Sequence, residues 1–154
     1  MHVLGIRVEP KKTSFVVIGN NDDRFEVVNS ELIKVPSALD FPEKLKYMRN
    51  CVLDILREYS IVYAGIRVAE ANTKNLDITR LHIEGVVQEA FSSSDVCGYF
   101  VGRKTSIAAR LKLKPKQIED ILNGEYEYTG IGNWKILSQK SSKEAALVAM
   151  GAVA

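Results

Sequence analysis

The sequence has few of the residues, and none of the long apolar runs, that mark several large classes of protein. Its two cysteines, Cys51 and Cys97, lie far apart without metal-ligand spacing and without a nearby histidine. We therefore expect reduced thiols in the core rather than a disulfide or a zinc site. No run approaches the roughly 18–20 apolar residues of a membrane span, and the N-terminus lacks a basic segment followed by an apolar stretch. These absences predict a soluble, cytoplasmic protein.

The chain also has little net charge. The formal value is +2 at pH 7, which is too small to indicate a nucleic-acid partner by itself, so any such argument depends on local clusters of charge. The length of 154 residues and the hydrophobic content of 46% are enough for one well-buried core. Without a repeat, a low-complexity segment or a linker, we expect a single domain over residues 1–154.

Two apolar runs within residues 3–18 flank a short polar corner at Pro10–Lys12, which predicts an antiparallel hairpin. Helical periodicity, capping residues and further apolar runs predict the other elements. We expect a kinked third strand within residues 24–35, a helix over 41–59 after the cap Asp40, and a strand over 61–69. A helix should then run from the cap Asp77 to residue 91, followed by a strand over 96–101. Short helices are expected over 105–111 and 115–123, the second stopped by Gly124, and a terminal helix over 141–154 that a Ser141–Glu144 capping box opens. Residues 125–139 are assigned to a loop that can hold one short strand.

The hairpin resembles the opening of the RuvC Holliday-junction resolvases, approximately (I/V)LG-I-D-P-G…T-G-(Y/W)-(G/A)-V-I. Val3-Leu4-Gly5-Ile6 matches before the turn, and Thr13, Phe15, Val17 and Ile18 match after it without a gap. IRVAE at 66–70 and RLHIEGVVQEAF at 80–91 are similar to the family's catalytic strand and the helix after it, and the last 14 residues resemble its final helix. The resemblance implies an α/β, RNase H-like fold: a mixed five-stranded sheet, three antiparallel strands and then parallel ones, flanked by helices.

The resemblance also implies two-metal chemistry, in which carboxylates from separate elements hold a pair of Mg²⁺ or Mn²⁺ ions. At the matching positions this chain has Arg7, Glu70 and, near its end, Ser142 and Ala145, so one carboxylate remains. A guanidinium stays charged and accepts no hydrogen bond, so it would repel a divalent cation. We expect Arg7 to pair with Glu70 across neighbouring strands and the metal-dependent activity to be lost, with no cofactor. The alternative is an exposed arginine at a strand end.

A second hypothesis retains the chemistry. Glu9 follows Arg7 by two residues, on the same strand face, and with Glu70 and Glu144 it could form a displaced carboxylate set. These three would then be the catalytic residues of a divergent endonuclease that uses Mg²⁺ or Mn²⁺. Otherwise Glu144 only caps the helix at Ser141, and Glu9 is an exposed turn residue.

Residues 103–116 are rich in basic side chains and contain no acid before Glu119. Such a run can contact a phosphate backbone, although a solvated helix face is the commoner explanation. Trp134 could stack on a base or pack against the terminal helix. We expect a nuclease-deficient module that binds DNA or RNA with duplex or branched structure; the alternative is a regulatory domain that binds protein and no nucleic acid. A homodimer is expected because RuvC-like resolvases are dimers. The candidate nucleic-acid contacts are Arg103, Lys104, Arg110, Lys112, Lys114 and Lys116.

Overall fold

Three antiparallel strands at the start of the chain form one half of a sheet. In the computed structural model, which describes residues 1–154, β1 (His2–Val8) pairs with β2 (Thr13–Asn21), and β2 pairs with β3 (Arg24–Ile33). The hairpin places Val3 opposite Ile18, as its two apolar runs predict. The expected kink in the third strand is a register shift where Val17 and Ile18 of β2 face β3. The predicted meander is therefore confirmed.

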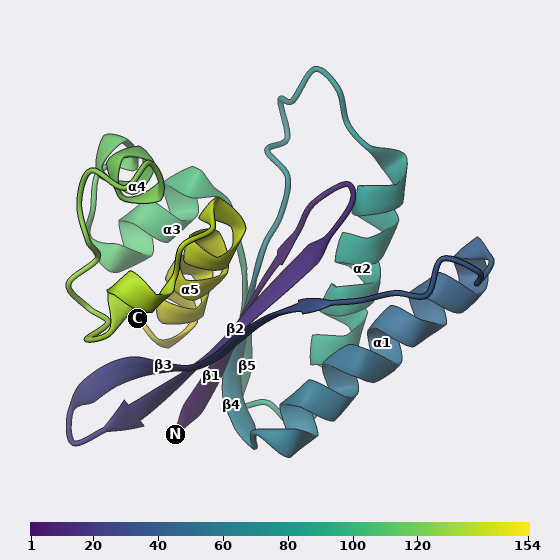
Figure 1. The fold of residues 1–154 in the computed structure, drawn as a ribbon, viewed down its shortest axis with the longest axis horizontal. Coiled ribbons are helices and arrows are strands. Elements are labelled where there is room, and N and C mark those ends of the chain that lie inside the picture. Colours follow the sequence, from purple (N-terminus) through teal and green to yellow (C-terminus); the bar gives the residue numbers. More distant parts are fainter.

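Two helices carry the chain back to extend the sheet with parallel strands. α1 (Phe41–Glu58) leads to β4 (Ile61–Arg67), which pairs with β1, and α2 (Ile78–Ser92) leads to β5 (Gly98–Gly102), which pairs with β4. The strand order is β3-β2-β1-β4-β5 (Figure 1). The carboxylates of Asp40 and Asp77 cap the helix starts by accepting hydrogen bonds from backbone N–H groups at 2.9 and 2.8 Å. The helix starts predicted from Asp40 and Asp77 are therefore confirmed.

The sheet separates two hydrophobic cores. α1 and α2 cover one face, while α3 (Lys104–Leu111), α4 (Pro115–Leu122) and α5 (Lys140–Val153) lie on the other (Figure 1). α5 packs almost against the strand backbones: a Cβ on Gly5 of β1 would lie 1.8 Å from the carbonyl oxygen of Ala145, and one on Gly65 of β4 would lie 2.5 Å from that of Val148. This close approach brings the side chains at the start of α5 over the ends of β1 and β4.

Three details differ from the sequence-based expectation. α5 begins after Gln139 rather than at a Ser141–Glu144 capping box: both residues are buried inside the helix, and the Ser141 hydroxyl accepts a hydrogen bond from Ser14 at 3.0 Å. β5 begins at Gly98, two residues later than expected. Cys97 is exposed and Cys51 is half-buried, so neither thiol belongs to the core, although both are free.

The poorly patterned segment 125–139 is mostly loop. It contains a 3₁₀ turn, η1 (Trp134–Ile136), and one bridge from Ile131 to Phe25 of β3. Trp134 is 4% exposed and meets the Tyr128 ring edge-on, with centroids 5.8 Å apart, so it packs into the core beneath α5 rather than facing a base. None of the helices is long and apolar enough to cross a lipid bilayer.

Candidate functional site: an arginine–carboxylate network

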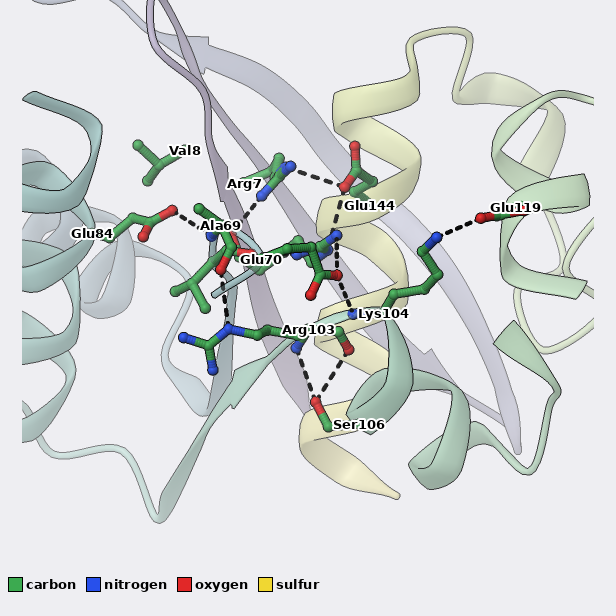
Figure 2. A network of polar contacts seen from close by, with 12 residues as sticks. Arg7, Val8, Ala69, Glu70, Glu84, Arg103, Lys104, Ser106, Glu119 and Glu144 are labelled. Carbon is green, nitrogen blue, oxygen red and sulfur yellow. Dashed lines mark hydrogen bonds and ion pairs between the residues drawn. The ribbon is translucent and has the colours of Figure 1, made fainter. Parts of the chain in front are cut away.

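The candidate site lies where β1 and β4 end side by side. Because these strands are parallel and in register, Arg7 stands next to Arg67, and the chain after β4 adds Glu70. α5, which packs on one face of the sheet, contributes Glu144, and Figure 2 shows Glu144 beside Arg7. The carboxyl ends of neighbouring parallel strands are a common place for ligand sites in α/β folds. Here they carry two guanidinium groups.

Glu144 is the centre of this network. Its Oε2 lies 3.1 Å from Arg7 Nε and 3.4 Å from Arg67 Nε, and the three side chains are 8%, 12% and 9% exposed. Arg7 also donates a hydrogen bond to the carbonyl oxygen of Arg67 at 3.2 Å. Burial lowers the pKa of Arg7 to about 10, while the Glu144 carboxylate opposes that shift, so the guanidinium remains protonated at neutral pH. One buried carboxylate therefore forms ion pairs with two neighbouring arginines.

Glu70 has a different and more exposed role. Its Oε1 accepts a hydrogen bond from Arg67 Nη2 at 3.1 Å and another from the backbone N–H of Lys104, at the start of α3, at 3.2 Å. Its side chain is 35% exposed. The predicted Arg7–Glu70 pair is wrong, because α5 supplies the partner of Arg7 and Arg67 takes Glu70. The prediction missed Arg67 because the hydrophobic residues around it in the sequence gave no reason to single it out.

A second buried carboxylate lies beside the network and was also missed. Glu84 of α2 accepts a hydrogen bond from the Ala69 N–H at 2.9 Å and lies 3.4 Å from Arg80 Nε, with 5% of its side chain exposed. Burial raises the pKa of Glu84. Arg80 and Arg103 donate to the carbonyl oxygens of Val8 and Ala69 at 2.9 and 3.0 Å, which ties the strand ends to α2 and to the start of α3. The four-residue spacing of Arg80 and Glu84 could have indicated an ion pair, but not its burial.

The residues of the displaced carboxylate set do not converge. Glu9 lies at the β1–β2 turn, where its Oε1 is buried without a hydrogen bond and 3.9 Å from Lys12 Nζ. No three His, Cys, Asp or Glu side chains in the chain are placed to hold a metal ion together. The guanidiniums of Arg7 and Arg67 both contact Oε2 of Glu144, so a metal ion would have to displace them from this oxygen. This donor set does not fit the pair of Mg²⁺ or Mn²⁺ ions that the family resemblance implies.

Much of the basic run at 103–116 is engaged within the protein. Lys104 pairs with Glu119, and Lys116 lies 2.8 Å from Asp120. Arg110 lies over the Phe100 ring, 4.0 Å from its centroid, and donates to a backbone carbonyl of α5 at 3.1 Å. Arg103 is anchored at the strand ends, as described above. Only the ammonium groups of Lys112 and Lys114 are exposed and without an ion pair.

Comparisons with known proteins agree with this architecture. No protein-family model matches the chain. Over 73 residues, 47% of its length, it is 36% identical to the crossover junction endodeoxyribonuclease RuvC of Bordetella parapertussis. The match spans 40% of that relative, less than half of its length.

Solved structures extend the similarity over nearly the whole fold. Thermus thermophilus RuvC aligns with a TM-score of 0.71 and 14% identity over 98% of this chain and 92% of that one. The same protein in complex with a Holliday junction substrate aligns with a TM-score of 0.70, 15% identity and the same coverage. The yeast mitochondrial Holliday junction resolvase gives a TM-score of 0.56 at 12% identity over 97% of this chain and 77% of that one. The predicted resemblance to the RuvC family and the RNase H-like fold are confirmed.

Proposed function

We propose that this chain is a RuvC-type domain that binds nucleic acid with duplex or branched structure but no longer cuts it with bound metal ions. The observation that carries the proposal is the Arg7 guanidinium, buried at the end of β1 and ion-paired with Glu144 at 3.1 Å. In the family pattern this position of the first strand carries the first catalytic aspartate.

The physical argument concerns charge. Two-metal hydrolysis needs several oxygen ligands around two divalent cations, which together stabilise the attacking and leaving oxygens. Here Arg7 and Arg67 bring two positive charges to the strand ends, and Glu144 and Glu70 compensate them within the protein. A cation entering this site would meet both guanidiniums and would have to displace them from their carboxylates. The network therefore supports a structural role for the former catalytic region.

Nucleic-acid binding is supported by the fold rather than by catalytic groups. The matched T. thermophilus RuvC has been solved with a Holliday junction substrate, and the alignment with it covers 98% of this chain. A fold that retains its strands and helices can retain a docking surface after the loss of the metal ligands. The alternative of a divergent endonuclease that uses Glu9, Glu70 and Glu144 is the principal competitor.

The test combines metal titration, cleavage and binding on one protein preparation. Mn²⁺ and Mg²⁺ are titrated by calorimetry, and four-way-junction and duplex DNA and RNA are assayed for cleavage with each metal and for binding by fluorescence anisotropy. We expect no cleavage, no specific metal binding, and salt-dependent binding of nucleic acid. Metal-dependent cleavage that Glu70→Gln abolishes and Glu119→Gln retains would establish the divergent nuclease. A chain that neither cleaves nor binds any of these substrates would instead be a protein-binding regulatory domain.

A homodimer is part of the same proposal. Ile78 and Leu81 on α2 are 71% and 40% exposed, and they line a groove of ≈ 550 Å³ between α1 and α2. Large apolar side chains that gather in one groove commonly mark a contact surface, and a second copy would cover them. Light scattering during the binding assay gives the mass of the free and bound protein.

A further inference from the structure

A cavity of ≈ 420 Å³ lies beyond the tip of the β1–β2 hairpin, on the side of the sheet covered by α1 and α2. It is bounded by the hairpin turn, the end of β3, the start of α1 and the start of α2; Figure 1 shows the hairpin tip beside the upper end of α2. Its charged lining consists of Lys11, Lys12, Lys34, Lys44 and Glu9. We call it the lysine cavity.

The charges in the lysine cavity are strongly unbalanced. Four lysines and one glutamate line it, and the single ion pair among them joins Lys12 to Glu9 at 3.9 Å. Lys11, Lys34 and Lys44 have no carboxylate within ion-pair distance. Asp40 and Glu43, at the start of α1, do not line the cavity.

The other hollows of the protein have a smaller excess of positive charge, or none. The larger groove along β3, of ≈ 1370 Å³, shares Lys12 and Lys34 with the lysine cavity, and its three carboxylates form no ion pair with either lysine. In the groove between α1 and α2, Arg49 pairs with Glu89 at 2.5 Å. In the run at 103–116 two of the lysines are paired with acids. Among these hollows, the lysine cavity therefore gathers the most lysines that lack an ion-pair partner.

Such a concentration of positive charge attracts anions. Ammonium groups around one concave surface repel one another, and low-dielectric walls focus their field on whatever enters. A ligand that carries regularly spaced single negative charges can meet several of these lysines at once. A phosphodiester backbone has this property, and binding it would release its condensed counterions.

We propose that the lysine cavity binds the phosphate backbone of nucleic acid, through Lys11, Lys34 and Lys44. This inference rests on the proposed function and gives it a location. The cavity adjoins the arginine–carboxylate network: Glu9 lies two residues after Arg7 on the chain, and Thr79, in the cavity wall, precedes Arg80. A strand that passes the ends of β1 and β4 would continue into the lysine cavity rather than along residues 103–116.

Two variants that each remove three unpaired positive charges test this placement. The cavity variant carries Lys11→Gln, Lys34→Gln and Lys44→Gln. The control variant carries Lys74→Gln, Lys112→Gln and Lys114→Gln, which includes the two unpaired lysines of the 103–116 run. Binding of a fluorescent four-way junction, a DNA duplex and an RNA duplex is measured by anisotropy over a range of NaCl concentrations, and circular dichroism verifies the fold of both variants.

The cavity variant is expected to bind roughly 30- to 500-fold more weakly than the wild type at 0.1 M salt, and the slope of log Kd against log[NaCl] should fall by about 2.7, which corresponds to three lost phosphate contacts. The control variant should keep most of the wild-type slope. The melting temperature of neither variant should fall. The cavity substitutions relieve repulsion between lysines, and the control substitutions alter exposed side chains.

The outcomes separate the two proposals. A wild-type protein that binds none of the three nucleic acids overturns both. Wild-type binding that the control variant weakens as much as, or more than, the cavity variant leaves nucleic-acid binding intact and overturns the lysine cavity as its site. Selective loss in the cavity variant supports it, and the junction, DNA and RNA arms show which backbone it prefers.

Discussion

Replacing Glu144 by glutamine should destabilise the protein strongly, because this buried carboxylate is ion-paired with two guanidiniums. At the observed separations of 3.1 and 3.4 Å, each attraction is worth about 5 kcal/mol before desolvation at an effective dielectric constant near 20. Desolvation of the charges offsets much of this in the intact network. Removal of one partner leaves that cost uncompensated, and the free energy of unfolding should fall by about 3–5 kcal/mol.

Urea unfolding, followed through the fluorescence of the buried Trp134, measures this loss. The matched control is Glu119→Gln, which removes one exposed carboxylate paired with Lys104 and should leave the unfolding midpoint almost unchanged. Arg7→Gln and the Arg7→Gln/Glu144→Gln double variant complete a cycle that isolates the Arg7–Glu144 pair from Arg67. A loss below about 1 kcal/mol in Glu144→Gln, with a coupling energy near zero, would refute a buried network and with it the main support for the degenerate site.

Two further predictions concern packing and pH. Gly5→Ala should destabilise the protein by about 3 kcal/mol or more, because the new methyl group would collide with the Ala145 carbonyl. Gly85→Ala adds a methyl group at an exposed position of α2 with no atom within 4 Å, and it should be neutral or stabilising by about 1 kcal/mol. Thermal unfolding compares the two variants, and equal effects would contradict the close approach of α5. Because burial raises the pKa of Glu84, the folded protein takes up this proton before the unfolded chain does. The stabilisation from protonation is complete below the unfolded pKa of about 4.3 and is lost as pH rises through the folded pKa, so the wild type should gain stability relative to Glu84→Gln as pH falls from 7 to 4.5. A difference between the two urea curves that is constant, or that shrinks on acidification, would contradict the burial of this carboxylate.

Local patterns in the sequence were sufficient for most of the fold. Alternating and continuous apolar runs set the strands, and the carboxylates of Asp40 and Asp77 set the helix starts, because both signals act over a few neighbouring residues. The Ser141–Glu144 pattern failed for the same reason. It satisfies the local rule for a capping box, but packing of α5 on β1 buries both side chains and gives them partners in distant strands.

The sequence by itself determined that the first strand of a RuvC-like hairpin carries an arginine where the family pattern has an aspartate, and that Glu70 follows the next parallel strand. Only the tertiary structure decided how those charges are compensated: Glu144 meets Arg7 and Arg67, while Glu70 meets Arg67 and the start of α3. It likewise paired Lys104 and Lys116 with acids and left Lys11, Lys34 and Lys44 of the lysine cavity without an ion-pair partner. The physical reason is that strand and helix patterns are local, whereas a charge is neutralised by whichever group the packing of distant elements brings within a few ångströms of it.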